Sequence, residues 1–416
     1  MSNSRLTAFD ILYGIFSNDA YSNIALDKNL DGVDSKDKPF VTALVYGVVE
    51  RKLTLEYLIQ PYLKGKTKPK VKLVLLIGVY QLYFMDKIPS RAAINETVAL
   101  AQAVGASYYK GLINAVLHKI DQNRIDIDKI KDLSIRFSCP THLINMWKKQ
   151  YGEDSTMQIL SSINEKPPVF VVPNTTIVDI DECLYELNNA CIEGEIDGDV
   201  IKINFLFDLN TCKPFIDGLF HIEDMSSYDC AYALNPKENE TILDVCAAPG
   251  GKTFTMAELM NDSGKIISCD IHPHRVELIK NGAKRLTLTN IECVVNDASI
   301  YNNKIGTVDK VLCDVPCSGF GIIRRKPEIR YKELDSVKDL PDIQYNILSV
   351  SSKYLKKGGL IVYSTCTLNK KENEKVVKRF LDNNDNFKLI KEKTAFPSEN
   401  SGDGFYYAVM LSLIHI

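Results

Sequence analysis

Short apolar runs alternate with helical stretches from about residue 240 onward, and this alternation restricts the fold of the 416-residue chain more than any other feature. The apolar runs are Thr241–Cys246, Lys265–Cys269, Lys310–Asp314 and Gly359–Ser364. Helical periodicity marks Phe254–Met260, Arg275–Leu286, Asp342–Leu355 and Glu372–Leu381. Apolar strands that alternate with helices predict a mostly parallel sheet with helices on both faces. We therefore expect residues 236–416 to form an α/β Rossmann-like domain.

The N-terminal part of the chain has a helical pattern instead. Apolar residues recur at helical spacing in Leu6–Phe16, Ile94–Ala101 and Leu112–Ile120, and prolines separate the segments. Residues 1–125 are therefore expected to form an all-α domain of about five to seven helices.

Residues 126–235 combine both kinds of pattern. They contain a helix near His142–Lys149 and short apolar or alternating runs such as Val169–Val172 and Val200–Phe205. A small α+β middle domain is expected there, so the whole chain is predicted to be multidomain.

The formal net charge of -3 hides an uneven distribution. Residues 1–140 carry 19 basic and 14 acidic side chains, and residues 241–416 carry 25 and 21. Residues 178–240, in contrast, carry 3 basic and 15 acidic ones. The total excludes a uniformly basic polyanion binder, whereas the two mildly basic segments allow a local nucleic-acid surface.

Cysteine usage and hydropathy indicate the compartment. The 11 cysteines are an odd number and are scattered along the chain. The longest apolar stretch, Val71–Met85, contains Lys72 and Gln81 and is too short and polar to cross a bilayer. No apolar signal segment follows Met1. We expect a reduced, cytoplasmic protein without a membrane segment, in which a prominent cysteine is catalytic.

A strand, a glycine-rich turn and a helix are expected over Leu243–Thr253, which spells LDVCAAPGGKT. Ligands of open α/β sheets bind at the carboxyl ends of the strands. Asp270 ends the next strand, where a carboxylate can accept both ribose hydroxyls, and Asp297 ends the following one, near an adenine amino group. The turn is no G-x-G-x-x-G, and Pro249 removes a backbone donor that a phosphate would need. This favours S-adenosyl-L-methionine, which has no phosphate, as the cofactor.

Two cysteines follow the ends of two further strands, Cys317 in VLCDVPCSG and Cys366 in VYSTCT. The sheet is therefore expected to bring both thiols to one crevice beside the cofactor. Addition of a thiolate to C6 of cytosine makes C5 nucleophilic, and a second thiol can assist proton removal or release. A redox pair is the weaker alternative. Four other cysteines are expected to be inert small apolar residues: Cys183, Cys230, Cys269 and Cys313.

With these motifs, residues 241–410 resemble the catalytic domain of the RNA (C5-cytosine) methyltransferases, the Nop2/Sun family, a branch of the class I methyltransferases. The matching strings are LDVCAAPGGKT, CDIHPHR, NDAS, VLCDVPCSGFGIIRRKPEIR, STCTLNKKENE and GDGFYYAVM. The resemblance implies that Cys366 is the nucleophile, that Cys317 assists turnover and that Asp314 hydrogen-bonds the target base. It also implies which residues line the S-adenosylmethionine site: Cys246, Ala247, Ala248, Pro249, Gly250, Gly251, Lys252, Asp270, Asp297 and Asp314.

The N-terminal half resembles the NusB-like helical RNA-binding domain in the strings LVYGVVERKLTLEYLI, LLIGVYQLYFMDKIPSRAAINETVALA and GLINAVLHKI. The fusion of the two domains is similar to family members that act on small-subunit rRNA. Val171–Asn174 lacks an RNA-facing arginine that the resemblance would place there, and Glu223 stands where glutamine is common. The apolar tail Leu411–Ile416 lacks a polar, basic ending, so we interpret it as foreign sequence.

A basic run follows the Cys317 loop and is expected to hold the RNA backbone: Arg324, Arg325, Lys326 and Arg330. The leading hypothesis is cytosine-C5 methylation of small-subunit (16S) ribosomal RNA by a monomer without a metal. Two alternatives stay open, namely the same chemistry on tRNA or another RNA, and a non-catalytic assembly or antitermination factor. The second alternative leaves both thiols without a chemical purpose.

Overall fold

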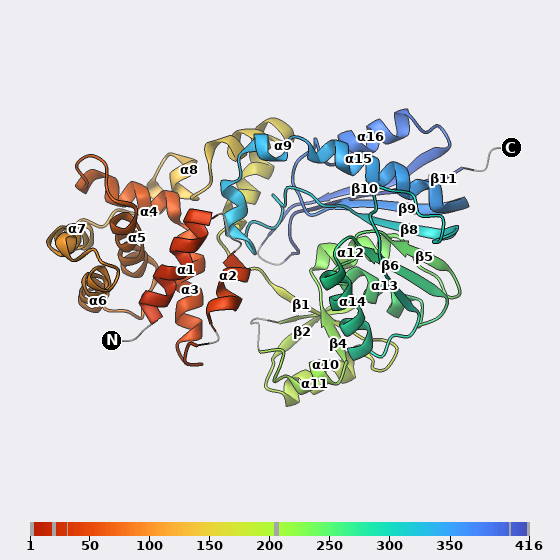
Figure 1. Ribbon diagram of the computed structural model, residues 1–416, viewed down its shortest axis with the longest axis horizontal. Coiled ribbons are helices and arrows are strands. Elements are labelled where there is room, and N and C mark those ends of the chain that lie inside the picture. Colours follow the sequence, from red (N-terminus) through yellow and green to blue (C-terminus); the bar gives the residue numbers. More distant parts are fainter. Residues whose placement is uncertain (1–3, 19–21, 31, 204–207, 399–400, 414–416) are drawn as a thin grey trace. The chain divides into compact units, whose positions relative to one another are not determined.

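The computed structural model describes residues 4–18, 22–30, 32–203, 208–398 and 401–413. The chain forms two compact units, drawn in Figure 1. The helical unit comprises residues 1–149 and 323–332, and the catalytic unit comprises 150–322 and 333–416. These units differ from the three domains expected at 1–125, 126–235 and 236–416. The largest difference is that the basic run after Cys317 belongs to the helical unit.

The helical unit is built around an almost entirely apolar helix, α5 (Pro69–Phe84). Its proline at the first position needs no hydrogen-bond partner, and nearly every residue from Val71 to Val79 is buried in the core. Gly47 of α3 lies against the Tyr80 ring of α5, where a Cβ atom would be 1.9 Å from the ring. The other elements are α1 (Ser4–Asn18), α2 (Ser22–Asn29), α3 (Lys38–Glu50), α4 (Lys52–Ile59), η1 (Gln60–Tyr62), α6 (Ser90–Ala103), η2 (Ser107–Tyr109), α7 (Lys110–Gln122), η3 (Ile127–Lys129), α8 (Leu133–Arg136) and η4 (Pro327–Tyr331).

An antiparallel sheet in the order β2-β3-β1-β4 opens the catalytic unit. Its strands are β1 (Val169–Pro173), β2 (Gly194–Asp197), β3 (Val200–Ile203) and β4 (Phe220–Ile222), and its helices are α10 (Ile180–Asn189) and α11 (Lys213–Ile216). The preceding helix α9 (Thr141–Ser162) is interrupted at Gly152, whose φ is 84°. The expected α+β middle domain is confirmed. The expected run Val200–Phe205 forms β3 as far as Ile203, and its last two residues lie outside the described residues.

The main sheet has the order β10-β11-β9-β8-β5-β6-β7. The five strands from β9 to β7 are parallel, as expected, and β10 and β11 are antiparallel additions. Because β5 lies between β6 and β8, the strand order reverses there, where α/β sheets bind ligands. The strands are β5 (Thr241–Asp244), β6 (Lys265–Asp270), β7 (Ile291–Val295), β8 (Val308–Asp314), β9 (Leu355–Thr365), β10 (Phe387–Ala395) and β11 (Phe405–Ser412).

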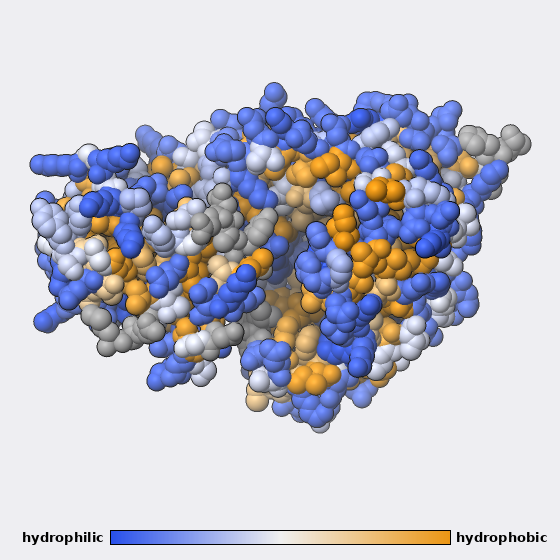
Figure 2. Space-filling view, in the orientation of Figure 1, coloured by the Kyte–Doolittle hydropathy of each residue, from blue (hydrophilic) through white to orange (hydrophobic). Residues whose placement is uncertain are grey.

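Helices cover this sheet on both faces, as Figure 1 shows. They are α12 (Met225–Ala233), α13 (Gly251–Leu259), α14 (Pro273–Arg285), α15 (Leu340–Ser351) and α16 (Glu374–Asp382), with the short turns η5 (Leu334–Val337) and η6 (Ser352–Tyr354). Two clusters of buried side chains, one on each side of the sheet, form the core. In Figure 2 the surface over α16 is hydrophilic, whereas apolar side chains gather over the region of β5 and β6.

The strand β11 includes the first two residues of the C-terminal tail. Leu411 pairs with both Lys388 and Leu360, and Ser412 pairs with Phe387. These two tail residues therefore belong to the sheet, because the alternating pattern of β11 continues through them. Residues 414–416 of the tail lie outside the described residues.

The long apolar stretch is a buried helix, as expected. It corresponds to α5, which packs against α3, α4, α6 and α7. Among the residues that the structure describes, no helix has the length and apolarity to cross a membrane.

Candidate active site

The glycine-rich turn joins β5 to α13 at the point where the strand order reverses. Gly250 has a φ of 118°, and a Cβ atom there would lie 2.4 Å from the Phe254 ring. The backbone therefore requires glycine at this position. A Cβ on Gly251 would meet the Glu223 carboxylate at 3.1 Å, so the turn also passes close to the loop after β4.

Asp244, the last residue of β5, is a buried carboxylate beneath this turn. Its Oδ2 accepts a hydrogen bond of 2.7 Å from Thr253 Oγ1, whereas its Oδ1 is buried without a hydrogen-bond partner among the described residues. Burial raises the pKa of Asp244 to about 7, against the opposing effect of the Thr253 hydrogen bond. A buried acceptor of this kind is suited to a donor on a bound ligand.

A cavity of about 170 Å³ opens at the turn. Its lining residues are Ile222, Glu223, Ser227, Asp244, Cys246, Ala247, Ala248, Pro249, Gly251, Lys252 and Asp314. The structure thus brings six of the seven predicted turn residues to one cavity and adds Glu223, Ser227 and Asp244. Gly250 does not line this cavity.

Lys252 and Asp314 form an ion pair across this cavity, with Nζ and Oδ2 2.9 Å apart. Lys252 also donates to Ser227 Oγ at 3.1 Å, and Ser364 donates to Asp314 Oδ1 at 2.8 Å. Burial by itself lowers the pKa of Lys252, but the Asp314 and Glu223 carboxylates outweigh it and raise the pKa above its ordinary value. Lys252 is therefore a fixed cation that orients Asp314.

Asp270 lies at the end of β6, as predicted, and is buried. Its carboxylate pairs with Arg275 at 3.1 Å and accepts a hydrogen bond from the His272 amide at 3.0 Å. The next residue, Ile271, is 52% exposed. An apolar side chain beside an oriented carboxylate can support a flat base next to its ribose.

Asp297 lies in the loop after β7, in a second cavity of about 500 Å³ that runs from Val295 to Asn303. Its Oδ1 accepts hydrogen bonds from the amide and the hydroxyl of Ser299, at 2.9 and 2.6 Å. These contacts fix the loop and orient the carboxylate.

The thiols of Cys317 and Cys366 lie 3.3 Å apart. This confirms the expectation that the strand ends of β8 and β9 bring them together. The hydrogen bond with Cys366, together with burial and the nearby Glu372 and Asp314 carboxylates, raises the pKa of the Cys317 thiol well above its usual value. Cys317 is therefore held as a protonated thiol at neutral pH.

Glu372 is fully buried behind these cysteines. It accepts hydrogen bonds from Ser318 at both its amide (2.9 Å) and its hydroxyl (2.6 Å), from Gln344 Nε2 (3.0 Å) and from Asn369 Nδ2 (2.9 Å). Ser318 Oγ also lies 2.7 Å from Thr367 Oγ1, next to Cys366. One carboxylate thus joins the two cysteine loops.

The four cysteines expected to be inert are fully buried: Cys183, Cys230, Cys269 and Cys313. Burial raises the pKa of Cys183 and of Cys269 to about 12 and raises the pKa of the other two as well. Their thiols are therefore neutral, and each packs as a small apolar side chain.

The predicted RNA contact of Arg330 is contradicted by its environment. Arg330 is fully buried in the helical unit, where its Nη1 donates to the carbonyls of Glu50 (2.8 Å) and Ser138 (3.1 Å). A guanidinium enclosed in this way cannot face a phosphate. Arg324 is buried as well, and only Arg325 and Lys326 of the run are partly exposed. The basic run was expected to be exposed because a series of charged residues in the sequence does not reveal whether the fold buries them against polar partners.

Several site residues were missed by the sequence analysis: Glu223, Ser227, Asp244, Arg275 and Glu372. The sequence did contain a signal for Asp244, because this residue ends a strand directly before the turn, as Asp270 ends its own strand. Glu372 had none, because the lysine-rich stretch Lys370–Lys375 is typical of a solvated helix start.

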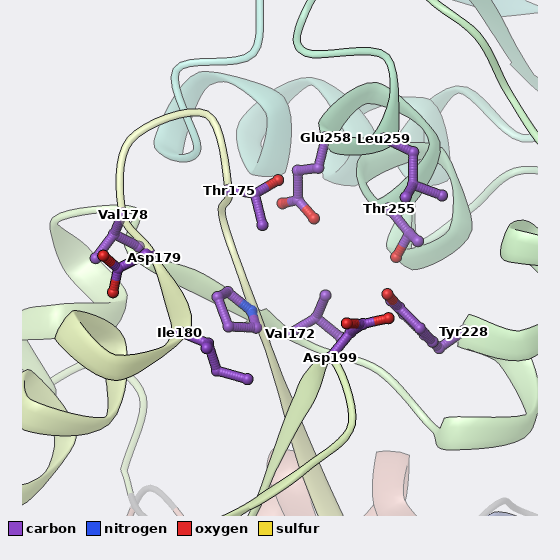
Figure 3. A pocket seen from close by; sticks show the side chains of 11 residues that line it. Val172, Thr175, Val178, Asp179, Ile180, Asp199, Tyr228, Thr255, Glu258 and Leu259 are labelled. Atoms are coloured by element: carbon purple, nitrogen blue, oxygen red, sulfur yellow. The ribbon is translucent and has the colours of Figure 1, made fainter.

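A third cavity of the catalytic unit, about 390 Å³, lies between the antiparallel sheet and α13. In Figure 3 the carboxylates of Glu258 and Asp199 and the hydroxyls of Thr255 and Tyr228 point into it. Its lining also includes Asp179 and no basic side chain. An acidic cavity of this kind disfavours a phosphate group.

The turn and the two strand-end carboxylates fit S-adenosylmethionine. The unpartnered Asp244 oxygen is an acceptor for an ammonium group, Gly250 and Gly251 leave room at the turn, and Asp270 is oriented for a ribose. Because S-adenosylmethionine has no phosphate, the turn does not need to bind one.

Three family models match the chain, and together they follow its whole architecture. The model described as 16S rRNA methyltransferase RsmB/F matches residues 231–411. The NusB family model matches residues 2–122, and the ferredoxin-like domain of RsmF/B-like methyltransferases matches residues 139–203.

Curated relatives extend this match over the full length. The probable ribosomal RNA small subunit methyltransferase B of Bacillus subtilis is 36% identical over 400 residues, which cover 92% of this chain and 89% of the relative. The probable enzyme of the same name from Synechocystis is 34% identical, with coverage of 93% and 91%. The chain belongs to this family of rRNA methyltransferases.

Solved structures confirm the fold. The crystal structure of PH0851 superposes with a TM-score of 0.82 at 26% identity and covers 98% of both chains. NSun6 from Pyrococcus horikoshii, solved with SFG, has a TM-score of 0.61 at 21% identity and covers 66% of this chain and 99% of its own. The family models and the curated relatives, together with these structures, confirm the predicted resemblance, the multidomain fold and S-adenosylmethionine-dependent methylation of rRNA.

Proposed function

We propose that this rRNA methyltransferase modifies C5 of a cytosine in small-subunit rRNA through a covalent adduct between Cys366 and C6. The observation that carries the proposal is the 3.3 Å separation of two thiols beside the cofactor cavity. A methyltransferase that methylates a nitrogen or a hydroxyl needs no thiol, because these atoms are nucleophiles themselves. C5 of cytosine, in contrast, becomes nucleophilic only after addition at C6.

The two thiols are assigned different steps. The Cys366 thiolate adds to C6, and the electron pair displaced from the C5–C6 double bond makes C5 nucleophilic. S-adenosylmethionine supplies an electrophilic methyl group on its sulfonium. The C5 proton then passes to solvent, and the C6–sulfur bond breaks to restore the double bond. The protonated Cys317 thiol assists this release by donating a hydrogen bond to the departing Cys366 thiolate. This assignment follows the family resemblance, which implies that Cys366 is the nucleophile and that Cys317 assists turnover.

Asp314 is proposed to hydrogen-bond the base and to favour its more electrophilic form. Its carboxylate is fixed by Lys252 at 2.9 Å and by Ser364 at 2.8 Å, at the junction of the cofactor cavity and the Cys317 loop. Asp270 and Asp297 are proposed to hold the ribose and the adenine. Arg325 and Lys326 remain proposed phosphate contacts. We further propose that the chain acts as a cytoplasmic monomer without a metal.

The assignment of the cysteines is tested by two single substitutions. Cys366→Ala should abolish both methyl transfer and covalent RNA–protein complexes, because the intermediate cannot form. Cys317→Ala should still form the thioether and accumulate it as a band that survives denaturing electrophoresis. If only the Cys366→Ala variant formed a covalent RNA–protein complex, the roles of the two cysteines would be reversed. Unchanged methylation in both variants would exclude the covalent mechanism.

The RNA target is tested with labelled methyl groups. Transfer to unmodified small-subunit rRNA, with bisulfite mapping of the product, is the expected result. Transfer to tRNA alone would favour the second candidate, the same chemistry on another RNA. No transfer to either RNA would favour a non-catalytic assembly factor.

A further inference from the structure

The strands β8 and β9 lead directly into the two cysteine loops. They pair in parallel, with Asp314 opposite Ser364, and lie side by side in Figure 1. Cys317 follows the end of β8 by three residues, and Cys366 follows the end of β9 directly. Because parallel neighbours end at the same edge of a sheet, the two strands deliver both thiols to one place.

Backbone hydrogen bonds tie the two loops together on both sides of the cysteines. The Val315 amide donates to the Ser364 carbonyl at 3.1 Å, and the Gly321 amide donates to the Cys366 carbonyl at 3.0 Å. A Cβ atom on Gly321 would lie 2.8 Å from this same carbonyl oxygen, so glycine is what allows the close approach. The separation of the cysteines is therefore set by the main chain and not by flexible side chains alone.

The two sulfur atoms lie close to bonding distance. They are 3.3 Å apart. A disulfide bond is about 2.0 Å long, so each sulfur needs to move by less than about 1 Å. The loops on which the cysteines lie are irregular and can take up a shift of this size. The structure thus holds a reduced pair that is almost in place for a disulfide.

Both cysteine side chains are also partly exposed. Six other cysteines are buried: Cys139, Cys183, Cys212, Cys230, Cys269 and Cys313. Oxidation by peroxide depends on access to solvent, and it spares enclosed thiols. The pair of Cys317 and Cys366 therefore combines access with a neighbouring thiol.

We propose that Cys317 and Cys366 are a modification site, at which a peroxide converts the two thiols into a reversible disulfide. The Cys366 sulfur attacks one peroxide oxygen, the O–O bond breaks, and the released hydroxide takes the Cys366 proton and leaves as water. The Cys317 sulfur then displaces the hydroxyl of the resulting sulfenic acid, which leaves as water with the Cys317 proton. Two thiols are oxidised, and one hydrogen peroxide is reduced to two waters.

The disulfide protects Cys366 from irreversible oxidation. A sulfenic acid without a neighbouring thiol reacts with further peroxide to a sulfinic acid, which thiols do not reduce. An exposed disulfide, in contrast, is readily reduced by an external thiol. The pairing follows from the geometry alone, and only its effect on methyl transfer rests on the proposed function, in which Cys366 is the nucleophile. Oxidation then switches methylation off, and reduction restores it.

The experiment treats the full-length protein with one molar equivalent of hydrogen peroxide and analyses the intact mass and the linked peptides by mass spectrometry. The main product should lack two hydrogen atoms and contain Cys317 joined to Cys366, and dithiothreitol should restore both thiols. The matched control is Cys191→Ser, which removes an exposed thiol after α10 and should form the same disulfide.

The variant Cys317→Ser tests the protection, and a thermal unfolding scan verifies that it is folded. It should form no disulfide with Cys366 and should instead gain oxygen atoms at Cys366 that dithiothreitol does not remove. Oxygen addition without a disulfide in the unmodified protein would overturn the proposal. So would a disulfide from Cys366 to Cys246, a residue that lines the cofactor cavity.

The mass readout does not depend on the covalent mechanism of methyl transfer. A disulfide form that still transfers methyl groups would confirm the modification site and contradict the proposed role of Cys366 as nucleophile. Failure of this inference and failure of the proposed function are therefore distinguishable.

Discussion

At the scale of single residues, Glu372 shows how strictly the cysteine loops are positioned. The four groups that contact its carboxylate are all donors, two on Ser318 and one each on Gln344 and Asn369. Glu372→Gln replaces one acceptor oxygen by an NH₂ group that faces donors, and each hydrogen bond lost in a buried site costs about 1–3 kcal/mol. We expect methyl transfer to fall by about tenfold or more, with the affinity for S-adenosylmethionine unchanged.

Single-turnover methylation and calorimetry with S-adenosylmethionine measure these two quantities separately. Glu374→Gln, two residues along the chain and only half-buried, is the matched control and should keep its rate. A wild-type rate in Glu372→Gln would show that the loops hold their position without this carboxylate.

At the scale of elements, the segment 323–332 contacts the rest of the helical unit through several hydrogen bonds, and Arg330 makes two of them. Besides the two hydrogen bonds of Arg330, Tyr331 donates to the Val49 carbonyl at 2.7 Å. Arg330→Ala leaves the carbonyls of Glu50 and Ser138 without this partner. We expect the free energy of unfolding of the helical unit to fall by about 2–4 kcal/mol. Denaturant titration measures this loss, with Lys326→Ala as the control of equal charge, and an unchanged midpoint would argue against the attachment.

The same elements show what the sequence could and could not predict. Buried parallel strands need continuous apolar runs, so the runs at 241, 265, 310 and 359 could be recognised, and the cysteines that follow the last two were expected to meet. Arg330 was misjudged because its carbonyl partners, Glu50 and Ser138, are distant in sequence. Glu372 was missed for the same reason, since Ser318 and Gln344 come from other segments. Sequence patterns report which surface is apolar and do not report which buried polar groups pair.

At the scale of the whole molecule, a buried ionic group joins the antiparallel sheet to the methyltransferase sheet. His221 of β4 lies 3.3 Å from Glu258 and 3.2 Å from Thr255, both on α13, and Thr255 donates to Glu223 at 2.6 Å. Because α13 begins at the glycine-rich turn, this group links the middle domain directly to the element that borders the cofactor cavity. Asn174 adds a second link through its 2.8 Å bond to the Leu286 carbonyl.

This link should make the stability of the catalytic unit depend on pH. Burial alone lowers the pKa of His221, but the carboxylates of Glu258 and Glu223 outweigh it and raise the pKa to about 9, above the ordinary value of 6.5. The folded state therefore holds the proton more tightly than the unfolded state. The resulting stabilisation is complete below about pH 6.5 and is lost as the pH rises through 9, by roughly 2–3 kcal/mol. Thermal unfolding of the protein at pH 6.5 and at pH 9 should show this fall, and His221→Gln should flatten it. An equally steep fall in the variant would assign the pH dependence to other groups.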